Sequence, residues 1–292
     1  MKPFILALLL CLPSLSQAQN SLGQDLEKSY NIWRTSLINK DVATWQRVTA
    51  EHRRIEVRNR IISEKLPFPA AIFDLPAPPP ALTGLKFLEA SINGATAKSA
   101  YFGKVDFGVG GDPTENLLVL SFVKGAGGWL YDRADFVNLT ALPEVRKELA
   151  SGDLGYLKGV PEAQPSGTVP PIPIAVNPAR TIAKVYVFCP GREVQVQINK
   201  ISRHRFANAK EAEVVLGGAK IGPNEVQFSV AKLEGGTGEE AMTIRIYLMS
   251  EVETVKPVKV FEYQVLENEP FKSYDTASFT LDAALAAKLM GK

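Results

Sequence analysis

Two proline-rich segments limit how this chain can fold. Twelve of its 20 prolines lie within residues 67–80 and 161–178. Proline has no backbone N–H and a fixed φ, so neither segment can continue a helix or a central strand. The residue pattern changes character after the second segment. The sequence therefore predicts two domains, 19–158 and 174–292, joined by a linker over 159–173.

The first 18 residues have the order of a secretory signal peptide. A lysine precedes an apolar run over residues 4–12, and Ser16-Gln17-Ala18 supplies small residues for cleavage after Ala18. The apolar run is too short to cross a bilayer, which takes about 20 residues. We therefore expect residues 1–18 to be removed. The mature chain is then secreted, to a periplasm or out of the cell, with no transmembrane segment.

Cysteine usage depends on this processing. The chain has 2 cysteines, Cys11 in the signal segment and Cys189. Lipidation of Cys11 is the alternative, but Leu9-Leu10 lacks the small residue expected before a lipidated cysteine. After cleavage, Cys189 is the only thiol. No intramolecular disulfide can then form, and stability has to come from packed cores.

The chain before residue 67 has a helical period. Apolar residues at three-to-four spacing predict a first helix over 22–37. One continuous second helix is predicted from a stripe formed by Trp45, Val48, His52, Ile55, Asn59 and Ile62. Asp41 is expected to cap this second helix, and Pro67 lies beyond its end.

From residue 85, apolar residues recur at every second position, which is typical of β-strands. Runs over 85–92 and 96–107 are joined by Asn93-Gly94, a dipeptide that tolerates the positive φ of a tight hairpin turn. Runs over 117–124 and 129–136 are joined by a glycine-rich turn. The N-terminal domain is therefore expected to be helices followed by a meander of about four antiparallel strands.

Several short motifs accompany this order of elements. They are Tyr30-Asn31-Ile32-Trp33, Leu37, Lys40-Asp41, Phe87-Leu88-Glu89, Asn93-Gly94-Ala95-Thr96-Ala97 and Gly128-Trp129. With the aromatic second helix, they make residues 22–138 resemble the NTF2-like (SnoaL-like) superfamily, whose cone-shaped fold wraps a curved antiparallel sheet over N-terminal helices. The proline-rich 67–80 segment departs from that pattern, since the family often has another helix there. The resemblance implies a cone with an interior cavity.

From residue 174 onward the sequence is typical of an all-β domain. Apolar and polar residues alternate strictly over 193–199, 225–230 and 242–248, which predicts strands with one buried and one solvated face. Further runs that bring the total to six or seven strands cover 181–188, 212–216 and 258–265. We expect a β-sandwich, followed by a short helix that Thr280 caps. The fold class of the whole chain is therefore α+β.

Composition and motifs exclude several functions. With 33 Lys+Arg against 31 Asp+Glu, the formal net charge is +2, which gives no electrostatic footprint for nucleic acid. The sequence has no phosphate-binding loop, no G-x-S-x-G elbow and no H-E-x-x-H helix. The 2 histidines and the one mature cysteine are too few and too dispersed for a closed metal site. We predict no metal and no cofactor, and a small ligand or a protein as the partner.

His52 is the candidate catalytic residue because it lies on an apolar stripe. The NTF2-like resemblance implies that this stripe faces the sheet or the cavity, where enzymes of that superfamily often place a general acid or base. Asp106 on a neighbouring strand is its candidate partner. The structural interpretation is a core histidine that bonds a backbone carbonyl or Asn59, and we favour it because a competent site needs more convergent groups.

Two basic clusters and the tryptophans have structural interpretations as well. Glutamates at helix-neighbour spacing indicate an ion-paired, solvated face for the first cluster, formed by Arg53, Arg54, Arg58 and Arg60. Anion binding is the alternative. Loop solubility explains the second cluster equally well, which is formed by Lys200, Arg203, His204 and Arg205. Core packing is favoured over ligand stacking for Trp33, Trp45 and Trp129.

Three functions remain open at this point. The favoured one is a secreted, non-catalytic binding or scaffold protein. The second is a small-molecule enzyme that uses the cavity of the N-terminal domain, with His52 and Asp106. The third is carbohydrate or surface binding by the C-terminal domain, which exposed coplanar aromatic rings such as Tyr247 and Tyr263 would support.

Overall fold

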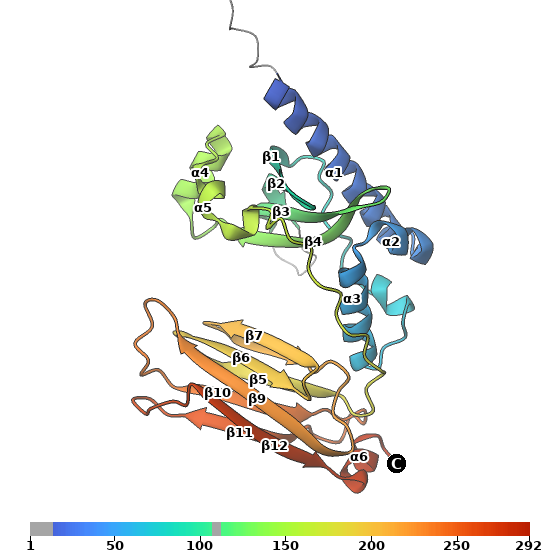
Figure 1. The fold of residues 1–292 in the computed structure, drawn as a ribbon, viewed down its shortest axis with the longest axis vertical. Helices are drawn as coiled ribbons and strands as arrows, with labels where there is room; N and C mark the ends of the chain where they lie inside the picture. The colour runs from blue at the N-terminus through green and yellow to red at the C-terminus, as the bar shows by residue number, and fades with distance from the viewer. Residues whose placement is uncertain (1–13, 107–111) are drawn as a thin grey trace, which may run out of the picture. The chain divides into compact units, whose positions relative to one another are not determined.

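A computed structural model describes residues 14–106 and 112–292 of the chain. The signal-peptide assignments to Cys11 and the apolar run before it lie outside the described residues. The described chain forms two compact units (Figure 1). The first comprises the described residues up to Arg54 together with Ile72–Ile172, and the second comprises Ile55–Ala71 and Pro173–Lys292.

The first unit is built on one antiparallel sheet with the strand order β1-β2-β3-β4. The strands are β1 (Lys86–Asn93), β2 (Thr96–Val105), β3 (Thr114–Gly125) and β4 (Gly128–Asn138). Both predicted hairpins are confirmed. In the first, Asn93 pairs with Thr96, so Gly94 and Ala95 form the turn, with Gly94 at φ +52°. A glycine meets that left-handed conformation without a steric penalty.

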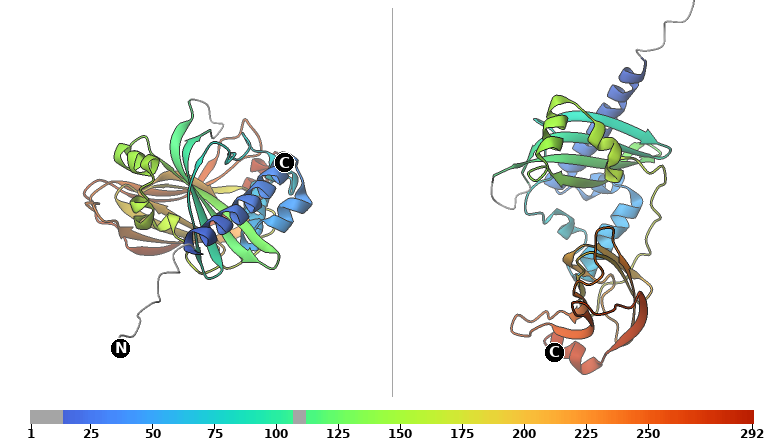
Figure 2. Two further views of the ribbon diagram at one scale, coloured as in Figure 1. Left: turned by 90° about the horizontal axis from the view of Figure 1, so that it is seen from above. Right: turned by 90° about the vertical axis from the view of Figure 1, so that its left-hand side faces the viewer.

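Helices cover both faces of this sheet (Figure 2). Helix α1 (Ser14–Ile38) lies on one face, where Leu26 and Tyr30 pack among Tyr101, Leu118 and Phe122. Helices α4 (Pro143–Ser151) and α5 (Gly155–Gly159) and the 3-10 turn η2 (Pro161–Ala163) lie on the other. Their buried residues pack against Ala100, Phe102, Leu117 and Val119. Alternation along the central strands therefore supplies an apolar layer to each side.

The predicted second helix is wrong in one respect, because it is two helices. Helix α2 (Val42–Val48) ends at Thr49, which is extended, and α3 (Glu51–Ser63) begins two residues later. Thr49 forms a parallel bridge with Tyr131 of β4, and the Ala50 N–H donates to the Tyr131 carbonyl at 2.8 Å. In a continuous helix the Ala50 N–H would donate to a carbonyl one turn earlier, but here it donates to the edge strand β4. The Asp41 cap of α2 is confirmed, since its carboxylate accepts from Thr44 N at 3.0 Å.

The second unit contains two four-stranded antiparallel sheets, with the orders β11-β10-β5-β8 and β12-β9-β6-β7. The strands are β5 (Ala183–Phe188), β6 (Arg192–Ile198), β7 (Ser202–Ala207), β8 (Lys210–Val214), β9 (Gly222–Lys232), β10 (Met242–Leu248), β11 (Val258–Val265) and β12 (Tyr274–Leu281). Inward residues from both sheets form a single apolar cluster, including Val185, Val196, Phe228 and Ile246. The mixed α+β class is therefore confirmed.

Two of these strands, β7 and β12, are not predicted from the sequence. Arg203, His204 and Arg205 of the second basic cluster lie on strand β7 rather than in a loop, because Ser202, His204 and Phe206 alternate inward between the arginines. Lys200 lies in the turn before the strand. Strand β12 has only Phe279 and Leu281 as clearly buried residues, so its apolar alternation is weak. The C-terminal helix α6 (Ala283–Leu289) is consequently shorter than expected. Asp282, not Thr280, caps it by accepting from Leu285 N at 2.7 Å.

Part of the second proline-rich segment is fixed to the first unit. Lys98 Nζ donates to the Glu162 carbonyl, Asn93 Nδ2 donates to the Pro165 carbonyl at 3.2 Å, and Gly167 N donates to Thr96 Oγ1 at 2.8 Å. Residues 168–172, in contrast, are all exposed. The unconstrained stretch of the expected linker is therefore short.

The second unit also holds a segment from before the sheet of the first unit. The Asn59 amide donates to the Ile174 carbonyl at 2.8 Å and accepts from Val176 N at 3.1 Å. Ser63 Oγ accepts from Gly217 N at 2.8 Å. These bonds tie α3 to the chain after residue 173, across more than a hundred residues of sequence.

A broad-specificity protease is expected to cut first within residues 168–172, because this stretch is exposed and its backbone bonds in the described chain are only the local ones between Thr168 and Ser166. The two fragments should stay associated in native gel filtration, since Asn59 and Ser63 remain bonded to the C-terminal fragment. They should separate only in denaturant. Early cutting at 79–80, whose carbonyls accept from Arg34 and Tyr30, would contradict this assignment.

Candidate functional site

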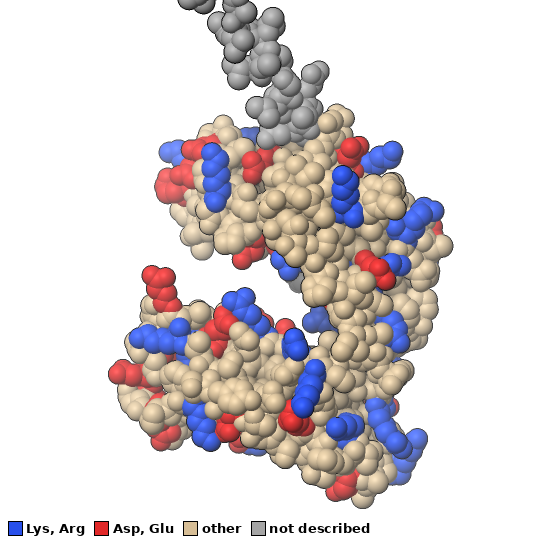
Figure 3. All heavy atoms as spheres, in the orientation of Figure 1, with Lys and Arg blue, Asp and Glu red and all other residues tan. Residues whose placement is uncertain are grey.

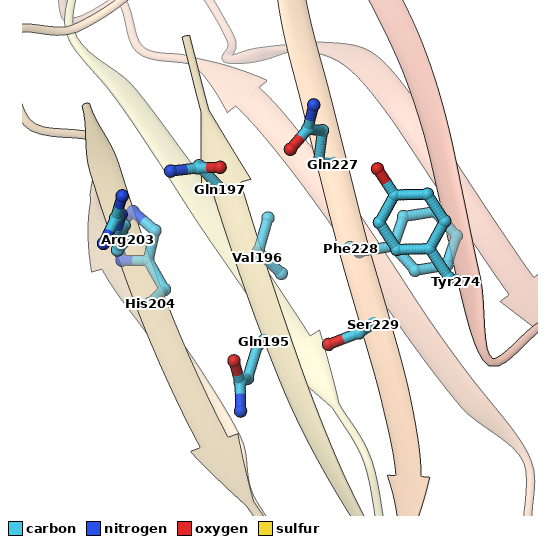
Figure 4. Close-up of a pocket in the computed structure, with 9 residues that line it drawn as sticks. All are labelled: Gln195, Val196, Gln197, Arg203, His204, Gln227, Phe228, Ser229 and Tyr274. Atoms are coloured by element: carbon cyan, nitrogen blue, oxygen red, sulfur yellow. The ribbon is translucent and has the colours of Figure 1, made fainter. Parts of the chain in front are cut away.

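A polar hollow lies on the outer face of the sheet β12-β9-β6-β7 (Figure 4). Its volume is about 270 Å³. The outward-facing side chains that line it are Gln195, Gln197, Arg203, Gln227, Ser229 and Tyr274, and we call this set the hollow. Val196, His204 and Phe228 alternate with them and are buried. Strict alternation therefore builds an apolar core and a polar outer surface from the same strands.

Strand register arranges the hollow in two rows. Arg203 pairs with Gln197, Gln197 with Gln227, and Gln227 with Thr276 of β12. A second row, parallel to the first, runs from Gln195 through Ser229 to Tyr274. Neighbouring strands lie about 4.8 Å apart, so a row that crosses four strands is about 14 Å long. That length accommodates an elongated ligand lying across the strands.

Several polar groups of the hollow are available to a ligand. Among the residues that the structure describes, the side chains of Gln197, Arg203 and Ser229 have no hydrogen-bond partner. Gln195 and Gln227 each use one amide donor, on Glu193 at 2.8 Å and Glu225 at 3.1 Å. A primary amide has two donors and a carbonyl acceptor, so both retain further capacity.

Tyr274 is the exposed aromatic ring of the hollow, with 60% of its surface accessible. Its hydroxyl lies 3.0 Å from Thr276 Oγ1, which holds the ring over the strand. The rings that the sequence singled out are arranged otherwise. Tyr247 meets Tyr186 edge to face at an interplanar angle of 75°, and Tyr263 packs against Phe228 with centroids 4.6 Å apart. These two tyrosines therefore do not form a coplanar platform.

A second hollow of about 860 Å³ runs along α1 and α2. Its lining includes both signs of charge, Glu27 and Asp41 with Lys28 and Arg47. The Asp41 carboxylate is already used as the α2 cap. The mixture of carboxylates and basic groups gives this surface no single charge preference for a ligand.

The second unit also contains a Ser–His–Glu arrangement. His204 Nε2 lies 2.7 Å from Ser202 Oγ, and His204 Nδ1 lies 2.6 Å from Glu213 Oε2. Hydrogen bonding to His204 and its charge, together with Arg60, lower the pKa of the Glu213 carboxyl, although burial opposes the shift. The order of groups matches that of a hydrolytic triad.

The surroundings of Ser202 give this arrangement a structural role. Ser202 is 0% exposed, and its Oγ accepts the Leu216 N–H at 2.7 Å. A nucleophile has to reach a substrate carbonyl and leave its lone pairs free to attack. The three residues instead join β7 of one sheet to β8 of the other at the edge where the sheets meet.

His52 is buried in the first unit, where its Nε2 lies 2.8 Å from Asp132 Oδ1. Arg53 Nε donates to the same oxygen at 3.2 Å. The partner is therefore neither a backbone carbonyl nor Asn59, whose amide bonds Ile174 and Val176. Asp132 is the extra residue of a β-bulge, because Ser121 pairs with Arg133 and Phe122 with Tyr131. A bulge of this kind re-aims one side chain out of the strand's alternation.

Asp106 lies elsewhere on the sheet. It directly follows β2 and is exposed, whereas the bulge at Asp132 is beside Ser121, the partner of Lys98. Asp106 is eight residues beyond Lys98, which corresponds to about 26 Å along a strand. The two candidate catalytic residues are thus at opposite ends of β2, and the carboxylate at His52 is one that the sequence did not select.

The cysteine and two of the tryptophans singled out from the sequence are buried or packed against other rings. Cys189 is a free, buried thiol whose pKa is raised by burial. The indole of Trp33 stacks on Tyr131 at 3.8 Å, and Trp45 is buried. Among the described residues, no group of three or more His, Cys, Asp or Glu side chains is placed to bind a metal ion. Lys, Arg, Asp and Glu are interspersed on the face shown in Figure 3.

Comparison with protein families, curated proteins and solved structures finds no match to this chain. No superfamily is therefore identified. Within the described part of the chain, no helix has the length and apolar character needed to cross a membrane.

Replacing His52 by Ala should lower the free energy of unfolding by about 1 to 3 kcal/mol, because Asp132 loses a buried hydrogen-bond partner. Asp132→Ala should cost a similar amount, and the double variant should cost less than the sum of the two. Urea denaturation measures all three. An unchanged midpoint for His52→Ala would indicate a histidine that is not part of the core.

Glu213→Gln should make unfolding less dependent on pH. The folded-state pKa of Glu213 is lowered, so its contribution is present above the unfolded value near 4.3 and is lost as the pH falls through the folded value. The loss at pH 7 should be below about 1 kcal/mol, because the carboxylate is 36% exposed and the bond is partly screened.

Urea midpoints at pH 7 and pH 3 provide the measurement for this variant. The difference from the wild type should shrink as the pH falls from 7 to 3, because the wild-type carboxyl becomes protonated as the pH approaches its lowered folded-state pKa. Glu211→Gln on the same strand is the control and should change neither midpoint. An equal loss at both pH values would show that Glu213 acts through packing alone.

Proposed function

We propose that this chain is an exported, non-catalytic binding protein that holds a hydroxyl-rich ligand, a carbohydrate, in the hollow of its second unit. In this proposal the first unit is an NTF2-like cone and serves as a scaffold, and the two sheets of the second unit form a β-sandwich. The observation that carries the proposal is the set of uncommitted neutral polar groups beside the exposed ring of Tyr274.

The chemistry of the hollow supports a sugar. Each sugar hydroxyl is both a donor and an acceptor, and the amides of Gln197 and Gln227 offer both functions on neighbouring strands. A tyrosine ring supplies an apolar surface with a polar edge, against which a pyranose face can pack. Sites of this kind are lined by a few polar groups that fix ligand orientation.

The state of the titratable residues supports binding rather than catalysis. His52 is committed to Asp132, and His204 is committed to Ser202 and Glu213. Catalysis by a general acid or base needs such a group within reach of a substrate proton. In the hollow, the groups that project outward are amides, a hydroxyl, a phenol and a guanidinium.

The domain assignments rest on element order. Helices α1 to α3 precede a four-stranded antiparallel meander, as in NTF2-like proteins. The two four-stranded sheets share one apolar cluster, as in a sandwich. Export rests on the basic, apolar and small-residue order of residues 1–18.

Binding of the full mature chain to a panel of soluble polysaccharides, measured by affinity electrophoresis and calorimetry, tests this function. The wild type should be retarded by at least one polymer. The variant Gln197→Ala/Gln227→Ala should lose about tenfold or more in affinity, because two ligand-facing amides are removed. Tyr274→Ala should weaken binding as well.

Tyr186→Ala is the matched control, since Tyr186 is an exposed tyrosine on the other sheet. It should bind as the wild type does. Absence of binding to every polymer, or equal weakening by Tyr186→Ala and Tyr274→Ala, would contradict a carbohydrate site in the hollow.

A further inference from the structure

The hollow contains a single cation, Arg203. It is the only Lys, Arg, Asp or Glu side chain among the residues that line it. Arg203 projects outward from β7 and has no ion-pair or hydrogen-bond partner in the described part of the chain. Its charge is therefore uncompensated at the end of the row that continues through Gln197 and Gln227.

Arg205, two residues further along the same strand, is paired with a carboxylate of the protein. Arg205 projects from the same face, and its Nη2 donates to Glu193 Oε2 at 2.7 Å. That contact lowers the pKa of Glu193 and neutralises the charge locally. The two arginines on this strand thus differ in their pairing, because Arg205 is bonded to Glu193 and Arg203 has no partner in the described part of the chain.

We infer that the ligand of the hollow is an acidic carbohydrate, a polymer that contains uronate residues, with the carboxylate of one residue bound by Arg203. This inference rests on the proposed carbohydrate function and specifies its substrate class. The planar guanidinium fork of Arg203 fits the two oxygens of a carboxylate. Gln197 and Gln227 then bind hydroxyls along the row, and Tyr274 lies at the far strand.

The count of charges favours a carboxylated sugar over a densely sulfated one. One cation in the hollow compensates one anionic group, and the other lining side chains that project outward are neutral. A heavily sulfated polymer places several negative charges over the same length and would require more basic partners. The row of about 14 Å takes a short oligosaccharide with a single carboxylate at the β7 edge.

The test compares uronate polymers with their methyl esters, because esterification removes the charge and keeps the sugar backbone. Polygalacturonate, alginate and hyaluronate are each titrated, as acid and as ester, against the full mature chain. The wild type should bind at least one acid about tenfold more tightly than its ester. Arg203→Gln should remove this preference by weakening the acid only.

Arg205→Gln is the matched control and should keep the preference for the acid, because Arg205 is already paired with Glu193. Binding of acid and ester with equal affinity by the wild type would overturn the acidic specificity and leave carbohydrate binding intact. An unchanged preference in Arg203→Gln, or tighter binding of dextran sulfate than of every uronate polymer, would overturn it too. If no polymer binds, neutral or acidic, the proposed function itself fails.

Discussion

The bulge that carries Asp132 organises the first unit. A buried carboxylate is costly unless it is paired, and Asp132 is paired with both His52 and Arg53 at the start of α3. The preceding residue, Tyr131, accepts the Ala50 N–H and stacks on Trp33. Two consecutive residues of β4, Tyr131 and Asp132, therefore fix where α2 stops, where α3 begins and how α1 lies on the sheet.

Strand alternation in the second unit separates an apolar core from a polar outer surface. Inward residues of both sheets form one apolar cluster, and the bond between buried His204 and half-exposed Glu213 joins the sheets along one edge. The outward residues of β6, β7, β9 and β12 are released from packing. They are free to carry polar chemistry, and the hollow with Arg203 lies among them.

His52 attracts attention in the sequence as a titratable group on an apolar stripe, whereas His204 is only one member of a basic cluster. The structure places each of them within a hydrogen-bonded network, one with Asp132 and one with Ser202 and Glu213. The groups that project outward in the hollow are neutral amides, a hydroxyl, a phenol and one guanidinium. Such residues carry no sequence motif, because their significance comes from their neighbours on other strands.

The sequence by itself determined the local structure of this protein, namely where apolar residues alternate in strands, where hairpins turn and where a helix is capped. The alternation over 193–199, 225–230 and 242–248, the two hairpins before residue 138 and the Asp41 cap follow from interactions between residues close in the chain. The break between α2 and α3, the pairing of His52 with Asp132 and the alignment of Arg203 with Gln197 and Gln227 were decided only by the tertiary structure. Each depends on strand register or on a bulge. These are set by packing over distant parts of the chain and leave no periodic trace in the sequence.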